Sequence, residues 1–164
     1  MFLRRSFLAL FVCSAGLLAA TLGSSVALVG GASDLVLDEA RGRLYLVASS
    51  QAQVQVYSLS QRRFLSAVKT DATPIGAAIS RSGKYLYVTS YDASSLNVID
   101  LDALGVVARV SLPAKPEGVA VGRDERVLIS TIGTGTNNLA NVLLVYDPSA
   151  KDQQSLINLS ITPP

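Results

Sequence analysis

The chain repeats itself at a spacing of about 42 residues, and this repeat restricts the fold more than any other feature. Counting 42 positions on from Tyr45 gives Tyr87, and Pro74 and Gly76 recur at the same spacing. A third copy follows, in which Ile129 falls at the position of Tyr87 before five extra residues enter the stretch GTGTNNLAN. Insertions of this kind are tolerated in surface loops. The repeat predicts a series of similar units that bury their apolar sides against one another.

Each copy contains four short segments that are typical of β-strands. In the second copy we expect them at 76–80, 84–90, 96–101 and 106–112, where Val, Ile, Leu, Tyr and Thr are concentrated. Turn residues such as Ser82-Gly83 separate them. A four-stranded unit of roughly 40 to 45 residues is typical of a β-propeller blade. We therefore predict an all-β propeller with blades at 33–74, 75–116 and 117–164; a β-sandwich is the alternative that the fixed spacing disfavours.

Residues 1–27 have the layout of a secretory signal peptide, with a helical apolar segment. Arg4 and Arg5 precede an apolar run over residues 7–22, and small residues then allow cleavage after Ala27. The run is shorter than the roughly 20 residues of a usual membrane-spanning helix. We predict a secreted, periplasmic or cell-surface protein that uses the general secretory route. One alternative is an uncleaved membrane anchor. The other is the twin-arginine route, because residues 4–8, RRSFL, resemble its motif.

The composition excludes several kinds of site. The chain has no His, and its one cysteine is Cys13 within the predicted leader. A Ser-His-Asp triad, a Cys-His pair and a His-ligated zinc site are therefore excluded, as is a disulfide within the chain. Without Arg4 and Arg5 the acidic and basic residues balance, which disfavours nucleic-acid binding. No catalytic, cofactor-binding or metal residue is predicted, and no cofactor.

The second copy resembles the YVTN family of β-propeller repeats. The matching residues are Pro74, Gly76, Ala78, Ser80, Gly83, the run Leu86-Tyr87-Val88-Thr89 and the run Val98-Ile99-Asp100. The resemblance covers about 33–164 and implies a propeller whose motif residues are structural. Because propellers close with about four to eight blades, we expect these three to belong to a ring of about seven. The chain is then the N-terminal part of a longer protein, or a fragment, or it closes a ring by self-association; Ser25–Val29 resembles the fourth strand of an incomplete copy.

The loops before each first strand, 70–73 and 114–117, are expected on one rim of the ring, where propellers usually bind ligands. The candidate contact residues there are Asp71, Asp92, Lys115 and Glu117. Other patterns favour structural roles. The equal spacing of Tyr45 and Tyr87 indicates packing between blades instead of a sugar-binding groove, and Asp100 and Asp147 are expected to bond turn amides instead of a metal ion. The glycine-containing stretch 133–138 lacks the third glycine and following helix of a phosphate loop.

Taken together, these features predict an exported propeller that serves as a binding scaffold for an unknown protein or small molecule. The alternative is part of a propeller enzyme, lactonase-like or quinoprotein-like, with its catalytic residues in other blades. A surface or adhesion protein with further modules is a third interpretation. The fold does not choose among them, because propellers serve all three purposes.

Overall fold

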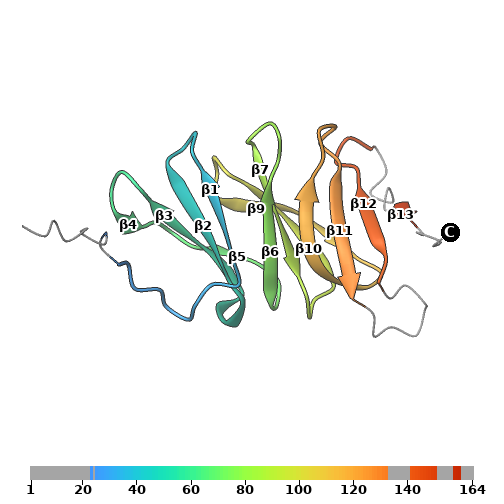
Figure 1. Cartoon of the computed structure of the whole chain (residues 1–164), viewed down its shortest axis with the longest axis horizontal. Coiled ribbons are helices and arrows are strands. Elements are labelled where there is room, and N and C mark those ends of the chain that lie inside the picture. Colours follow the sequence, from blue (N-terminus) through green and yellow to red (C-terminus); the bar gives the residue numbers. More distant parts are fainter. Residues whose placement is uncertain (1–22, 24, 133–140, 151–156, 160–164) are drawn as a thin grey trace, which may run out of the picture.

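Three antiparallel sheets follow one another along the long axis of the molecule (Figure 1). The computed structural model describes residues 23, 25–132, 141–150 and 157–159. Most of the predicted leader and the stretch 133–138 lie outside these residues. No helix in the described ranges is long and apolar enough to cross a membrane. The architecture is that of a β-propeller, as the sequence predicts.

The sheets are named blades 1, 2 and 3. Blade 1 contains β1 (Asp34–Asp38), β2 (Arg43–Ala48), β3 (Gln53–Ser58), β4 (Arg63–Phe64) and β5 (Val68–Lys69), with a short 3-10 turn, η1 (Ser49–Gln51). Blade 2 contains β6 (Pro74–Ile79), β7 (Tyr85–Ser90), β8 (Ser95–Asp100) and β9 (Gly105–Ser111). Blade 3 contains β10 (Lys115–Val121), β11 (Val127–Ile132), β12 (Leu143–Tyr146) and β13 (Ile157–Leu159).

Each blade is a meander in which successive strands pair antiparallel. Blade 2 has the four strands that the sequence predicts, with bounds that differ by one or two residues. Blade 1 differs because its outer strand is interrupted: β4 and β5 both pair with β3, and residues 65–67 between them are not part of a strand. Phe64 at the interruption packs edge-on against Tyr57, with ring centroids 5.2 Å apart.

The first strands of the blades, β1, β6 and β10, lie next to one another, with β6 in the middle (Figure 1). Their close approach restricts the residue at position 76. A Cβ atom on Gly76 would lie 3.1 Å from the carbonyl oxygen of Glu117 and 3.1 Å from Oγ1 of Thr89. The same threonine hydroxyl lies 3.2 Å from the Glu117 carbonyl, to which it can donate. Glycine is therefore required at this position because the neighbouring blade is so near.

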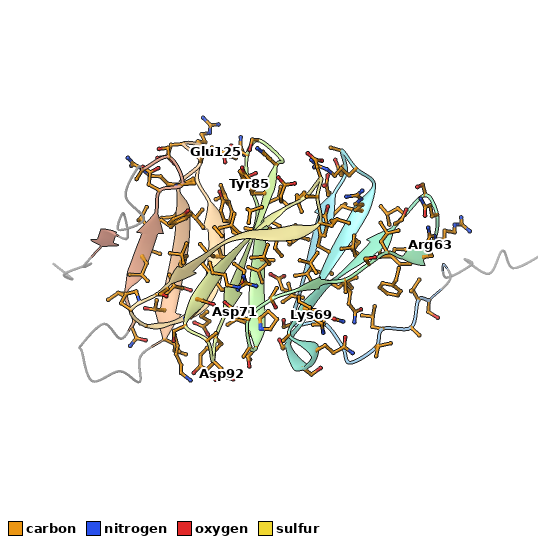
Figure 2. The ribbon with its side chains drawn as sticks, turned by 180° about the vertical axis from the view of Figure 1, so that it is seen from behind. Arg63, Lys69, Asp71, Tyr85, Asp92 and Glu125 are labelled. Carbon is orange, nitrogen blue, oxygen red and sulfur yellow. The ribbon has the colours of Figure 1, made fainter. Side chains whose placement is uncertain are left out.

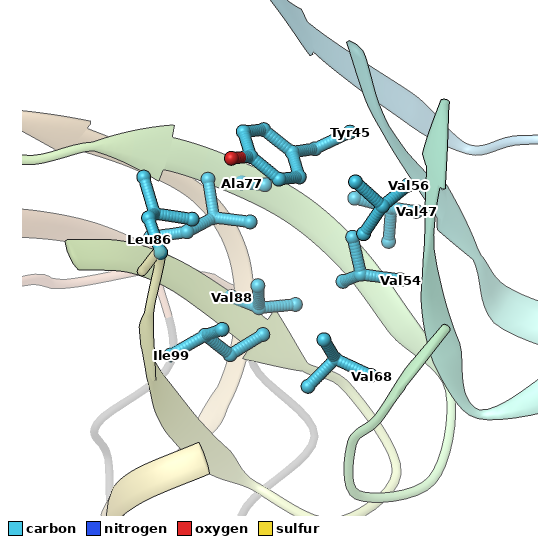
Figure 3. Close-up of a cluster of buried hydrophobic side chains, with 10 residues drawn as sticks. Tyr45, Val47, Val54, Val56, Val68, Ala77, Leu86, Val88 and Ile99 are labelled. Carbon is cyan, nitrogen blue, oxygen red and sulfur yellow. The ribbon is translucent and has the colours of Figure 1, made fainter. Parts of the chain in front are cut away.

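Apolar side chains fill the space between neighbouring blades. Successive side chains of a strand point to opposite faces, so each blade contributes to two interfaces. The cluster between blades 1 and 2 comprises Tyr45, Val47, Val54, Val56, Val68, Ala77, Leu86, Val88, Ile99 and Leu101 (Figure 3). The cluster between blades 2 and 3 comprises Tyr87, Leu96, Val98, Val110, Leu112, Val127, Ile129 and Leu144. Tyr45 and Tyr87 are each 1% exposed, which confirms that these tyrosines pack between blades.

The strand pairing shows that the alignment of the third copy with the second, made from the sequence, is wrong by one residue in the second strand. Ala78 lies opposite Tyr87, whereas Ala120 lies opposite Leu128. Leu128, and not Ile129, is therefore the counterpart of Tyr87. The reason is that the β10–β11 hairpin is one residue shorter than the β6–β7 hairpin. The sequence does not show this deletion, because the residues on either side are apolar in both copies.

Ser25–Val29, which resemble the fourth strand of an incomplete copy, form no strand within this structure. These residues pair with no strand, and every one of them is exposed. The segment instead runs beside blade 1, where the Val29 carbonyl accepts a hydrogen bond from Gln55 Nε2 at 3.0 Å. A strand needs a neighbouring edge that offers backbone donors and acceptors, and the described residues provide none at this place.

Candidate functional site

Asp71 and Asp92, two of the predicted rim residues, lie toward the same end of the blades (Figure 2). Asp71 lies in the connection between blades 1 and 2. Its Oδ1 accepts a hydrogen bond from Arg109 Nε at 3.1 Å, and its Oδ2 accepts one from Ser95 Oγ at 2.7 Å. Arg109 is on β9 and Ser95 on β8, so the carboxylate joins the connection to the outer half of blade 2.

Asp92 and Lys115 form a second pair at the same rim. The Asp92 carboxylate accepts a hydrogen bond from Thr73 Oγ1 at 2.6 Å and another from Lys115 Nζ at 3.2 Å. The ammonium also lies 4.4 Å from the centre of the Tyr91 ring, a cation–π contact. The hydrogen bond from Thr73, with a smaller effect of Lys115, lowers the pKa of Asp92. The pair connects the β7–β8 turn of blade 2 to the first residue of β10 in blade 3.

Glu117 takes no part in either pair. Its side chain is exposed on β10, and only its backbone carbonyl contributes a contact between blades. The structure thus brings Asp92 and Lys115 together, gives Asp71 a separate partner and leaves Glu117 apart. Carboxylates paired with cations in this way hold neighbouring strands, and the lowered pKa of Asp92 makes it a poor general base.

The opposite rim holds a second polar network, which the sequence did not predict. Arg41 in the β1–β2 hairpin contacts Asp102 at 2.7 Å and Asp38 at 3.1 Å. Its Nη1 also donates to the carbonyl oxygen of Gly83 at 2.7 Å. The hydrogen bond to Asp102, with the help of Asp38, raises the pKa of Arg41. This guanidinium joins the hairpin of blade 1 to two turns of blade 2, at sequence separations that no local pattern reveals.

Glu125 joins blades 2 and 3 at this rim. Its carboxylate accepts the backbone N–H groups of Arg81 at 3.0 Å and Ser82 at 2.6 Å. Its φ of 66° is close to the 70° of Gly83, so the two residues occupy the same turn position, as the repeat predicts. A non-glycine residue in this conformation is strained, and the two hydrogen bonds offset that strain.

A depression of about 760 Å³ opens beside this rim, between the hairpins of blades 1 and 2. Its lining includes the acids Asp38 and Glu39, the base Arg81 and the apolar side chains Leu37 and Ile79. The mixture of charges favours no single ligand class. Asp38 is moreover already engaged by Arg41.

A buried asparagine lies between these rims. Asn97 on β8 is fully buried, and its Nδ2 donates to Ser90 Oγ at 3.0 Å. Its Oδ1 has no hydrogen-bond partner within the described part of the chain. Its repeat counterpart, Gln55, bonds the backbone of the N-terminal segment instead.

The remaining candidate residues have structural roles. Asp100 Oδ1 accepts the backbone N–H groups of Asp102 and Ala103, each at 2.9 Å, and Asp147 Oδ1 accepts that of Ser149 at 2.9 Å. Both aspartates therefore bond turn amides, as predicted. Among the described residues, no group of three or more His, Cys, Asp and Glu side chains is placed to hold a metal ion.

The family model described as "Cytochrome D1 heme domain" matches residues 19–133 of the chain. No curated protein sequence matches significantly.

Several solved structures share the fold. Hydrazine synthase of Kuenenia stuttgartiensis superposes with a TM-score of 0.70 and 18% identity, over 84% of this chain and 39% of that one. Virginiamycin B lyase from Staphylococcus aureus has a TM-score of 0.63 and 14% identity, over 79% of this chain and 41% of that one. The Cps50 (Swd1) β-propeller domain of Myceliophteria thermophila has a TM-score of 0.61 and 12% identity, over 76% of this chain and 38% of that one. The chain thus spans about two fifths of the length of these propellers. Identities this low establish the propeller fold and nothing further.

Proposed function

Because the chain belongs to the cytochrome D1 heme domain family, we propose that it is an exported β-propeller scaffold whose three blades do not themselves ligate heme iron. The observation that carries this proposal is the pairing of the rim charges. Asp71 and Asp92 are each held by a cation and a hydroxyl group, so the described residues of that rim show no convergent set of free acids and bases. Charges that are already paired support a fixed binding surface better than proton transfer.

Among the described residues, few side chains suit the iron of the heme that the family name implies. Heme iron takes an axial ligand from His, Cys, Met or Tyr. The chain has no His, and Cys13 and Met1 are its single cysteine and single methionine, both outside the described residues. Tyrosine is therefore the remaining type of ligand among the described residues. Tyr45 and Tyr87 are buried between blades, and burial raises the pKa of each, which opposes formation of the phenolate ligand.

A hemin titration tests this part of the proposal. The mature chain, purified without heme, should give the absorbance spectrum of free hemin at every ratio. A heme-loaded member of the same family is the positive control. A saturable one-to-one change in the Soret band that a single Tyr→Phe substitution removes would show that the chain ligates iron and would refute the proposal.

Export is tested separately, in a Gram-negative bacterial host that carries the full-length gene. We expect the mature protein in the periplasm, with an N-terminus at Leu28 by mass spectrometry. The double substitution Arg4→Lys with Arg5→Lys should leave export unchanged, because the general secretory route needs positive charge and not a particular arginine pair. Loss of export in this variant would assign the twin-arginine route, and an uncleaved cytoplasmic chain would contradict export itself.

A propeller enzyme is the second candidate. Two of the structures that share the fold, hydrazine synthase and virginiamycin B lyase, are enzymes by name. On this hypothesis the three blades contribute walls of a site whose reactive groups lie in other blades. The scaffold and enzyme hypotheses differ in what Asp92→Asn does: a scaffold keeps its fold and loses only contacts at the rim, whereas an enzyme that uses this rim loses turnover.

A further inference from the structure

A group of polar residues lies behind the Asp71 rim, where blades 1 and 2 meet. Asn97 and Ser90 are both 0% exposed, and Asn97 Nδ2 donates to Ser90 Oγ at 3.0 Å. Ser95 Oγ donates to the Asp71 carboxylate at 2.7 Å, and Thr70 Oγ1 donates to the Asp71 carbonyl oxygen at 3.2 Å. These five residues are called here the interblade polar cluster.

The strand pairing places this cluster between blades 1 and 2. Asn97 on β8 lies opposite Val88 on β7, and residues opposite each other in an antiparallel pair share a face of the sheet. Val88 belongs to the apolar cluster between blades 1 and 2. Thr70 directly follows β5 of blade 1, which contacts β9 of blade 2. Two blades of this chain therefore enclose the cluster, whatever number of blades completes the ring.

The equivalent place between blades 2 and 3 is apolar. Counterparts follow from the strand pairing, with Leu128 as the counterpart of Tyr87. The counterparts of Asn97, Ser95 and Thr70 are then Leu144, Val142 and Leu112. All three counterparts pack in the apolar cluster between blades 2 and 3. The packing of two blades thus does not require polar residues here, and their presence between blades 1 and 2 calls for a different explanation.

Two buried polar groups of the cluster lack a good hydrogen bond. Asn97 Oδ1 has no partner among the described residues. Ser90 Oγ lies 3.5 Å from the Asp71 carbonyl oxygen, longer than the roughly 2.5 to 3.0 Å of an ordinary O–H···O bond. Turning the Asn97 amide over would let Ser90 donate to Oδ1, but it would leave Nδ2 unpaired instead. Unpaired buried polar groups destabilise the folded state, and ordered water commonly satisfies them.

We propose that the interblade polar cluster binds one water molecule. The water donates to Asn97 Oδ1 and to the Asp71 carbonyl oxygen, and it accepts a hydrogen bond from the Ser90 hydroxyl group. Three hydrogen bonds are typical of a buried water, and both groups that lack a good bond then gain a partner. The water joins β7 and β8 of blade 2 to the connection from blade 1, as bridging waters do elsewhere.

A divalent cation is a poorer occupant of this place. Ca²⁺ and Mg²⁺ take about six to eight oxygen ligands, carboxylates among them. The Asp71 carboxylate already accepts hydrogen bonds from Arg109 and Ser95. Water needs about two to four polar partners and no charge, which the cluster supplies.

A crystal structure of the purified chain, at a resolution that shows ordered water, tests the proposal directly. We expect a single electron-density peak within about 3.2 Å of both Asn97 Oδ1 and Ser90 Oγ. The region around Leu144 is the internal control and should show no such peak. Electron density without a peak beside Asn97, or a peak with the short distances and higher ligand number of a metal ion, would overturn the proposal.

The substitution Asn97→Leu, which copies Leu144 of blade 3, tests the proposal in solution. If water satisfies the amide, the variant loses hydrogen bonds, and the urea midpoint should fall by about 0.5 M, as for one lost hydrogen bond. If Oδ1 is unpaired, its removal relieves a cost, and the midpoint should stay the same or rise. Either of these last two results would refute the proposal.

Leu144→Asn is the matched reverse substitution. It places the same amide at the equivalent position among apolar side chains, where no polar cluster can hold a water. The urea midpoint should therefore fall further than it does for Asn97→Leu. An equal or smaller fall would show that a buried amide needs no such cluster, and would contradict the proposal. None of these results bears on the heme or export tests.

Discussion

The substitution Leu86→Ala tests whether packing between blades supplies the stability of the molecule. Leu86 is 0% exposed and lies in the cluster between blades 1 and 2 (Figure 3). The change removes three carbon atoms, which at about 0.8 kcal/mol each gives about 2.4 kcal/mol of lost transfer free energy. A remaining cavity of ~40 Å³ adds about 1 kcal/mol, because two hydrogen-bonded sheets cannot collapse into the space. We expect the free energy of unfolding to fall by about 3.4 kcal/mol.

The assay is urea denaturation followed by circular dichroism and tyrosine fluorescence, the latter because the chain has no Trp. With a slope of about 2 kcal/mol per molar urea, the midpoint should fall by about 1.7 M. Val107→Ala is the control, since Val107 is exposed and its truncation should change stability by less than about 0.5 kcal/mol. A loss of less than about 1 kcal/mol for Leu86→Ala would show that the blades do not pack as described.

Three further predictions concern single positions. Gly76→Ala should lower the free energy of unfolding by about 1 to 3 kcal/mol in urea denaturation, because the new Cβ would press on the next blade. Gly105→Ala is the control: its Cβ would meet nothing within 4 Å, so the free energy of unfolding should hardly change. Burial raises the pKa of Tyr87 to about 12, so the unfolded state loses the Tyr87 proton at a lower pH than the folded state does. The free energy of unfolding should therefore fall between about pH 10 and about pH 12, and Tyr87→Phe should make that fall smaller. Asp92 should titrate below its ordinary pKa by NMR, and Thr73→Ala should raise that pKa toward the ordinary value; an unchanged titration would show that the hydrogen bond is absent in solution.

The blade pattern could be predicted from the sequence because it depends on local order. Strand-forming runs, turn residues and the spacing of Pro74 and Gly76 all repeat along the chain, and the structure has the corresponding strands. The error at Ile129 arose because a one-residue deletion in a hairpin leaves the apolar pattern almost unchanged. Strand register across the hairpin, which depends on backbone pairing, reveals it.

The rim contacts could be predicted only in part. The loops that carry Asp71, Asp92 and Lys115 follow from the fold, so their common rim was expected. Their partners were not, because the partner of Asp71 is Arg109, 38 residues away, and Arg41 and Asp102 are 61 residues apart. Such pairs depend on the angle between blades, which no sequence spacing encodes. Ser25–Val29 form no strand here for a related reason: a strand needs a partner, and none of the described strands pairs with this segment.

The most direct test of the account is a double-mutant cycle between Tyr45 of blade 1 and Leu86 of blade 2. The variants are Tyr45→Ala, which removes the ring, Leu86→Ala and the double mutant. Both side chains belong to the cluster between these blades, so the two truncations should not be additive. We predict a coupling free energy of about 0.5 to 3 kcal/mol by urea denaturation. Additivity within about 0.3 kcal/mol would contradict the face-to-face packing of successive blades on which the whole account depends.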